Sequence, residues 1–298
     1  GERGEVEMAV NPRSLHGGDR TRRMISRMLA PLLIAVLFAA PPTYYRGNTH
    51  THTLWSDGDG APETVVAWYV LNGYNFLVLS DHNTMQHGED WFPVKEGTRL
   101  PPAKVDAIKE QFGAAWPELG DDEHGQQMRL RTLDELKRKF EKPGAFLLVP
   151  GEEVTDRFMR HEIHINAVNI DEVVRPQHGS SVQSTIQRNF DAIEAQGKKS
   201  GREVLAHLNH PNFVWSLTVE DVASLKGERF FEIYNGHRSV HNEGDATRPS
   251  TESMWDQALA LRLRDGAGDG DVLYGVATDD AHSYGVDDGV SIPGRGWV

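Results

Sequence analysis

The chain has 298 residues, of which 38% are hydrophobic and 25% charged, so it can fold around a sizeable core. Its 44 acidic and 31 basic residues give a net charge of -13, which disfavours nucleic acid and anionic membranes as partners. The absence of cysteine excludes disulfides, iron–sulfur clusters, thiolate zinc sites and thiol nucleophiles. Any metal ion must therefore be bound by His, Asp and Glu.

Residues 1–40 are expected to lie outside the folded domain. The segment MISRMLAPLLIAVLFAA, which begins at Met24, ends in an apolar run and is followed by Pro41 and Pro42. This layout is typical of a secretory signal peptide, because the run is shorter than the roughly 20 apolar residues of a transmembrane helix. Residues 1–23 show no apolar period and are interpreted as an upstream extension. We therefore expect a secreted or periplasmic protein, with an uncleaved membrane anchor as the alternative.

Residues 44–298 are expected to form one domain in which short strands alternate with helices. Helical patterns cover 62–73 and 182–197, and strand-like runs rich in β-branched and aromatic residues lie at 76–79, 145–149, 163–168, 204–208, 230–234 and 272–276. This alternation predicts a parallel sheet with outer helices, either a barrel or an open sheet.

Two further features concern the middle and the end of this domain. Residues 83–143 form a charged insertion with helical stretches near 103–112 and 132–141, and we expect it to fold over one face as a lid. The chain ends at Pro293–Val298, where a turn leads into what reads as the first residues of a strand. This ending predicts a truncated C-terminus with an unpaired edge at 294–298.

Side chains that can bind metal ions follow nearly every expected strand. His50 and His52 would project to the same side of an extended segment, so both imidazoles can reach one ion. A single His is weak evidence, but the C-terminal ends of successive strands are where α/β barrels place their active sites. Imidazole and carboxylate ligands without thiolate suit Mn, Zn or Fe. The clusters are His50, His52 and Asp57; Asp81 and His82; Glu152 and Glu153; His164; His207 and His210; and Asp279, Asp280 and His282.

The order of these motifs, H-x-H with a later Asp, then D-H, G-x-E, H, H-P and D-x-H, resembles the PHP (polymerase and histidinol phosphatase) superfamily of metal-dependent phosphoesterases. The stretch PGEEVTDRFMRHEIHINAVN is similar to members that hydrolyse nucleoside phosphates and short oligonucleotides. The resemblance runs from Tyr45 to His282. It implies an α/β fold, a distorted (β/α)7 TIM-like barrel, with two to three divalent ions (Mn, Zn or Fe) at the C-terminal ends of the strands.

The resemblance also implies which residues bind these ions. The first ion would be bound by His50, His52, Glu153 and Asp280; the second by Glu153, His164 and His210; and the third by Asp57, His82 and His282. Glu153 holds the third place of the G-x-E motif and would bridge two ions, whereas Glu152 should point away. The expected catalytic residues are Asp280, Glu153 and His210.

Other polar residues have two readings each. The candidates for substrate binding are Arg157, Arg160, Asn235 and Arg238, of which the arginines at 157 and 160 would clamp phosphate oxygens or lie in a plain solvated loop. His207 and Asp81 stand next to expected ligands. They either orient ligand imidazoles or make structural hydrogen bonds, and the sequence does not distinguish these roles.

The expected activity is hydrolysis of phosphate mono- or diesters by attack of a metal-bridging hydroxide. The 70 residues between His82 and Glu153 exceed the spacing in the compact nucleotide-hydrolysing relatives, so the resemblance extends only to a small phosphorylated substrate. Two alternatives remain: a metallohydrolase of amide or lactone bonds on the same barrel, and a non-catalytic metal- or partner-binding module. No stable nucleic-acid complex is expected, and no membrane contact apart from an uncleaved signal anchor.

Overall fold

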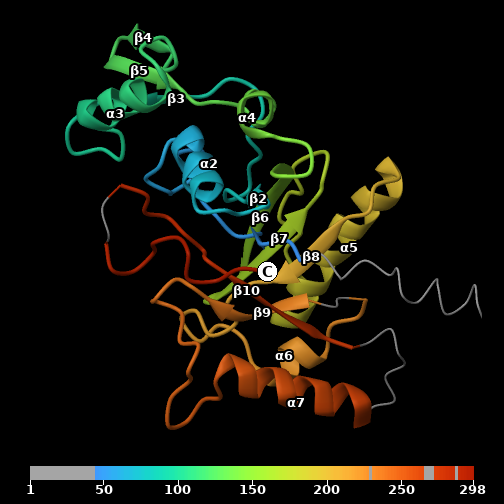
Figure 1. Ribbon diagram of the computed structural model, residues 1–298. Coiled ribbons are helices and arrows are strands. Elements are labelled where there is room, and N and C mark those ends of the chain that lie inside the picture. The colour runs from blue at the N-terminus through green and yellow to red at the C-terminus, as the bar shows by residue number, and fades with distance from the viewer. Residues whose placement is uncertain (1–43, 228–229, 265–271, 286–287) are drawn as a thin grey trace, which may run out of the picture. The chain divides into compact units, whose positions relative to one another are not determined.

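Seven strands form one sheet in the computed structural model, which describes residues 44–298 except 228–229, 265–271 and 286–287 (Figure 1). Their order in the sheet is β1-β2-β6-β7-β8-β9-β10. These strands are β1 (Gly47–Asn48), β2 (Phe76–Leu79), β6 (Leu147–Phe158), β7 (His161–Val168), β8 (Leu205–Leu208), β9 (Phe230–Asn235) and β10 (Tyr274–Thr278). The expected signal segment and upstream extension at 1–40 lie outside the described residues.

The sheet is mixed rather than wholly parallel, which corrects the expected topology. Neighbouring strands run parallel from β1 to β6 and from β8 to β10, but β7 is antiparallel to both β6 and β8. The reason is local, because β6 continues far past the expected strand at 145–149 and returns through a hairpin at Met159. Glu153 therefore lies inside a strand and not at its end.

The two edges of the sheet approach each other and nearly close it into a barrel. Thr51 forms a parallel bridge with Ala281, and the backbones of Gly47 and Val298 exchange two hydrogen bonds of 3.0 Å. The expectation of an unpaired edge is therefore wrong at Val298. The α/β class and the barrel-like seven-stranded sheet are as expected, but a regular sevenfold alternation of strand and helix is not found in the described residues.

Helices cover the outside of the sheet in two groups. Near β2 and β6, apolar side chains of α2 (Pro62–Leu71) and α4 (Leu133–Phe140) form one buried cluster. Around β7 and β9, a second cluster joins α5 (Val182–Ser200), α6 (Val219–Ala223) and α7 (Thr251–Arg264). These clusters hold the strands so that the carboxyl ends of the parallel strands meet on one side, whereas β7 runs the other way.

The helix ends follow ordinary capping rules. Pro62 starts α2, where its missing N–H has no partner to lose. Thr132 and Glu135 form a capping box at the start of α4. Gly201 ends α5 in the left-handed conformation, with a φ of 69°. Local sequence therefore determines where these helices begin and end.

The insertion between β2 and β6 contains a small subdomain of its own. A three-stranded antiparallel sheet with the order β3-β5-β4 packs with α3 (Pro102–Phe112). Its strands are β3 (Trp91–Pro93), β4 (Leu119–Asp122) and β5 (Gly125–Arg129). The two helical stretches expected in the insertion are found as α3 and α4, whereas its strands were not expected. The subdomain packs on the loop that follows β1.

No described helix combines the length and the apolar character needed to span a bilayer.

Candidate metal centre

The structure brings all nine expected metal-binding residues together. Their ligand atoms fall into four overlapping groups, and within each group these atoms lie within 4.8 Å of one another. The groups are His52, Asp57, His82 and His282; His50, His52 and Asp280; His50, Glu153 and His210; and His82, Glu153 and His164.

Glu153 occupies the middle of the cluster and is fully buried. Its Oε1 lies 3.2 Å from Nε2 of His50, 3.1 Å from Nδ1 of His164 and 3.3 Å from Nε2 of His210. Its Oε2 lies 2.8 Å from Nδ1 of His82. One carboxylate thus faces imidazoles from two of the four groups, which is the placement that a bridging ligand needs.

Asp280, which follows the edge strand β10, lies close to two imidazoles that follow β1 at the opposite edge of the sheet. Its Oδ1 lies 3.2 Å from Nε2 of His50 and 3.1 Å from Nε2 of His52. Asp280 has a φ of 48°, a left-handed conformation that Asp tolerates better than most residues. Its backbone N–H donates to the carbonyl of His50, so the turn is tied to the first strand segment.

Asn235, a candidate for substrate binding, is buried and forms hydrogen bonds within the protein. Its side-chain nitrogen donates to Glu232 at 2.9 Å and to Asp280 at 3.1 Å, and its oxygen accepts from the backbone of His237 at 2.8 Å. Both N–H donors of the buried amide are therefore used within the protein. Asn235 thereby positions the Asp280 carboxylate.

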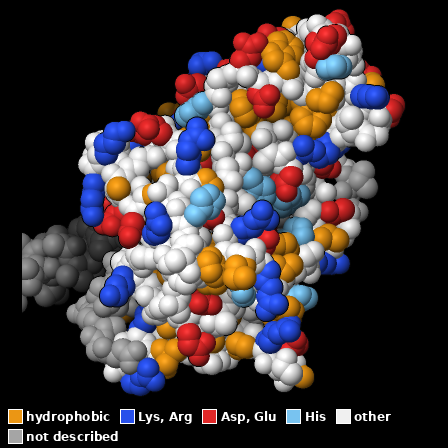
Figure 2. Space-filling model, turned by 180° about the vertical axis from the view of Figure 1, so that it is seen from behind, with side chains coloured by type: hydrophobic (Ala, Val, Ile, Leu, Met, Phe, Trp, Pro, Cys, Tyr) orange, Lys and Arg blue, Asp and Glu red, His pale blue; other side chains and the backbone are white. Residues whose placement is uncertain are grey.

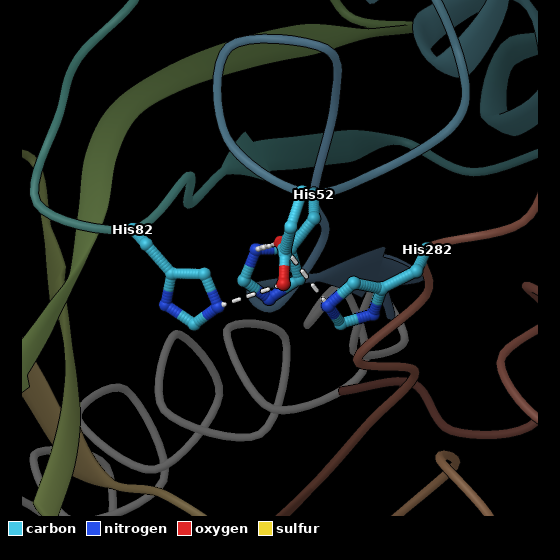
Figure 3. Close-up of side chains that lie close together, drawn as sticks. His52, His82 and His282 are labelled. Atoms are coloured by element: carbon cyan, nitrogen blue, oxygen red, sulfur yellow. Dashed lines mark ion pairs between the residues drawn. The ribbon is translucent and has the colours of Figure 1, made fainter. Parts of the chain in front are cut away.

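The most exposed group of ligand atoms surrounds Asp57 (Figure 3). Three imidazoles point toward its carboxylate, with nitrogens 3.6 Å (His52), 3.4 Å (His82) and 3.3 Å (His282) from its oxygens. The Asp57 side chain is 56% exposed, whereas that of His52 is fully buried. Gly58 allows this loop to fold back, because a Cβ there would lie 2.5 Å from the carbonyl of His52.

Glu232 is a site residue that sequence analysis missed. Its Oε1 lies 2.7 Å from Nδ1 of His50 and accepts from the Thr278 hydroxyl at 2.6 Å. Its Oε2 accepts from the backbone N–H of His210 at 2.8 Å. Carboxylates commonly fix metal-binding imidazoles in this way. The signal was available, since an acidic residue interrupts the apolar run FFEIY of β9.

Asp81 and His207 make structural hydrogen bonds. Asp81 accepts from the backbone N–H and the hydroxyl of Thr53 at 2.7 and 2.9 Å and from the hydroxyl of Ser56 at 2.6 Å. Asp81 therefore holds the start of the loop that carries Asp57. His207 lies 3.0 Å from the hydroxyl of Thr49.

Glu152 points away from the cluster, as expected for its position next to Glu153 in a strand. It is fully buried and accepts a hydrogen bond from the backbone N–H of Val174. Burial raises the pKa of its carboxyl to about 7.

The three candidate arginines are exposed. Arg157 lies on the same face of β6 as Glu153, four residues further on, and Arg160 follows the hairpin turn. Arg238 lines a cavity of about 460 Å³ together with His237. Among the described residues, none of the three arginines forms an ion pair with the nine. Figure 2 shows histidine side chains near the middle of one face, with basic side chains beside them.

Several atoms of the cluster lack the partners that buried polar atoms normally have. In the described part of the chain, Nε2 of His50, Nε2 of His52 and Oε2 of Glu153 make no hydrogen bond. Burial lowers the pKa of His52 to about 3, which favours the neutral, ligating form of its imidazole. Burial alone would raise the pKa of Glu153, but the neighbouring imidazoles hold it well below its ordinary value. Unpartnered imidazole and carboxylate atoms that face one another fit divalent cations.

Comparisons with known proteins give structural neighbours only. No protein family and no curated protein matches the chain. A two-domain protein of Bacteroides vulgatus with a predicted PHP-like metal-dependent phosphoesterase is 17% identical (TM-score 0.40), and the match covers 81% of this chain and 53%, about half, of that one. A protein of Bifidobacterium adolescentis inferred to be a metal-dependent phosphoesterase is 14% identical (TM-score 0.41; 84% and 92% covered).

A third neighbour is an amidohydrolase of Chromobacterium violaceum with bound sulfate and no metal. It is 16% identical with a TM-score of 0.37, and the match covers 82% of this chain and 89% of that one. PHP-like phosphoesterases and an amidohydrolase are thus among the structural neighbours. At these identities and TM-scores, the likeness does not assign a reaction to the chain.

Proposed function

We propose that the chain is a metal-dependent hydrolase that cleaves phosphate mono- or diesters. The observation that carries this proposal is the convergence of six imidazoles and three carboxylates, with the buried Glu153 between two groups of them. Two to three divalent ions would be held by these nine residues. When bound, such ions supply a nucleophile near neutral pH and neutralise charge on the phosphoryl group.

The chain's own residues fix the geometry of this reaction. Glu153 would hold two cations at a set separation, because both of its oxygens already face imidazoles from different groups. Glu232 orients His50 through Nδ1 and leaves Nε2 directed at Asp280 and Glu153. Asn235 donates to Oδ2 of Asp280 and so fixes this carboxylate beside Nε2 of His50 and of His52, where it would bind an ion and take up a proton during hydrolysis.

The proposed substrate is a small phosphorylated molecule. Arg157 lies on the face of β6 that carries Glu153, and its guanidinium would bind phosphate oxygens of the substrate. Arg238 and His237 line the cavity beyond Asn235, where the rest of the substrate would bind. With a net charge of -13, the chain needs such local cations to attract an anion.

The test combines metal analysis with a phosphate-release screen. Purified protein is analysed by mass spectrometry for bound metal and then assayed on a panel of mono- and diesters with Mn, Zn or Fe added. We expect at least two ions per chain and cleavage of one ester class, measured as phosphate released from monoesters or as alcohol released from diesters.

The variant Asp280→Asn should lower this rate about a hundredfold or more, the usual scale for an acid–base group. The matched control Asp106→Asn removes an equivalent charge from an exposed helical position and should leave the rate unchanged. A metal-loaded protein that cleaved neither mono- nor diesters but cleaved amides or lactones would replace this proposal with the carbonyl hydrolase. Metal binding without any turnover would replace it with a binding module.

A further inference from the structure

The loop of residues 53–61, which carries Asp57, is packed against the inserted subdomain on both sides of that residue. Leu54 and Ala61 belong to the subdomain's own buried apolar cluster, in which they join Leu100, Val105 and Met128. The Asp57 loop is therefore part of the subdomain core, although it comes before β2 in the chain. Its two ends are anchored in that core.

Between these two ends, Arg99 of the subdomain holds the loop through its backbone. One guanidinium nitrogen, Nη1, donates to the carbonyl of Ser56 and to the carbonyl of Gly58, each at 2.7 Å. These carbonyls belong to the residues directly before and after Asp57. The Arg99 guanidinium also lies 5.0 Å from the ring of Phe92 in β3, which fixes its position.

A second cation holds the next residue of the loop. Lys104 of α3 donates to the carbonyl of Asp59 at 2.6 Å and lies 3.1 Å from its carboxylate. In the described residues, Arg99 forms no ion pair with a carboxylate, although the chain is acidic. Its guanidinium binds the backbone carbonyls of the Asp57 loop instead. That use of an Arg is explained if the loop must be held in one conformation.

The barrel itself holds only part of this loop. Asp81 binds Thr53 and Ser56 from the inside, and the backbone N–H of Asp59 donates to the carbonyl of His282 at 2.7 Å. The contacts of the Asp57 side chain are with imidazoles of the cluster and, at 3.4 Å, the Ser56 hydroxyl. Its direction is thus set by the backbone at 56–58, which Arg99 fixes from outside.

We propose that Arg99 is a positioning residue for Asp57, so that binding of the most exposed ion depends on the inserted subdomain. The inference rests on the proposed metal centre and deepens it. In this proposal the insertion fixes the loop that carries the metal ligand Asp57, whereas the sequence predicted that it acts as a lid. Residues that orient a ligand typically change metal affinity by about 10- to 100-fold.

The test measures metal binding rather than activity. Metal-free wild type, Arg99→Ala, Asp57→Ala and the double variant are titrated with Mn²⁺ or Zn²⁺ by calorimetry, and stoichiometry is checked by mass spectrometry. We expect Arg99→Ala to lower the affinity for one ion by about tenfold or more, and this should be the ion whose binding Asp57→Ala abolishes. The affinities for the other ions should stay unchanged. In the Asp57→Ala background, the Arg99 change should have no further effect, because the two residues act on one ion.

A second readout does not involve metal. Hydrogen exchange of amides 54–60 in the metal-free protein should be faster in Arg99→Ala than in wild type, and Arg99→Lys should restore part of the protection. Arg138→Ala, which removes an exposed arginine from α4 of the same insertion, is the matched control and should match wild type in both measurements.

The outcomes separate the two proposals. If wild type binds no metal, both proposals are overturned. If wild type and Asp57→Ala differ in metal binding but Arg99→Ala behaves as wild type, only the role of Arg99 is overturned. Equal weakening of all ions by Arg99→Ala also overturns that role, because it would show a general loss of structure.

Discussion

Oε1 of Glu232 lies 2.7 Å from Nδ1 of His50, while Nε2 of the same ring lies 3.2 Å from both Asp280 and Glu153. His50 and Glu232 are both fully buried. With Nδ1 committed to Glu232, the ring can present only Nε2 to an ion, and it cannot rotate without breaking a buried hydrogen bond. Glu232 therefore determines both the tautomer and the direction of a central imidazole.

Replacing Glu232 by Gln should weaken metal binding without unfolding the protein. Gln keeps the shape of the side chain but removes the charge that supports the Nδ1–H of His50, so we expect metal affinity to fall by about 10- to 100-fold. Competition with a fluorescent chelator measures this change. Asp106→Asn removes a carboxylate from an exposed helical position, and a loss of affinity as large as that of Glu232→Gln would argue against a specific role for the Glu232 carboxylate.

Glu153→Gln and Asp280→Asn should have different consequences. Glu153→Gln removes a negative charge from between two proposed cations, so bound metal and phosphate release should be lost together. Asp280→Asn should retain part of the metal while phosphate release falls by about a hundredfold or more. Metal content and rate are measured on the same samples. Full metal occupancy in Glu153→Gln would contradict its bridging role.

Removing metal should destabilise the folded protein. Ligands that bind only the native state stabilise it by about 2.7 kcal/mol at a hundredfold excess over Kd, which corresponds to roughly 5 °C or more in Tm for a chain of this size. Thermal unfolding is followed with chelator and again after Mn²⁺ or Zn²⁺ is restored. The same additions should change the Tm of Glu153→Gln much less, and equal shifts in both proteins would point to binding elsewhere.

The stability of α4 should depend on pH through Glu135. Hydrogen bonds from Arg129 outweigh burial and lower the pKa of Glu135 to about 2. Because the folded-state pKa lies below the unfolded value, this stabilisation is present above about pH 4.5 and is lost as the pH falls toward 2.

Glu135→Gln should therefore cost about 1 to 2 kcal/mol at pH 7, after allowance for solvent screening, and progressively less toward pH 3. Urea unfolding at several pH values measures the difference from wild type. Asp134→Asn, an exposed neighbour in the same helical turn, is the control. A cost that is constant with pH would indicate lost packing rather than a lost ionic contact.

The sequence by itself determined the local elements and the set of candidate ligands. The strand at 76–79 and the helix that starts at Pro62 follow from short-range patterns, so they could be predicted at nearly their true bounds. The nine metal-binding candidates could be named because the order of the His, Asp and Glu motifs resembles that of the PHP superfamily, which needs no knowledge of contacts.

Only the tertiary structure decided which residues support those ligands and how. Glu232 is 182 positions from His50, and Arg99 lies more than forty positions from the carbonyls it holds, so no local pattern links either pair. The antiparallel course of β7 was likewise missed, because the pairing of β6 with β7 depends on a hairpin and not on the hydrophobic pattern of either strand. Hydrogen bonds between distant segments form only after the chain has packed, so the order of the residues does not show which partners these bonds join.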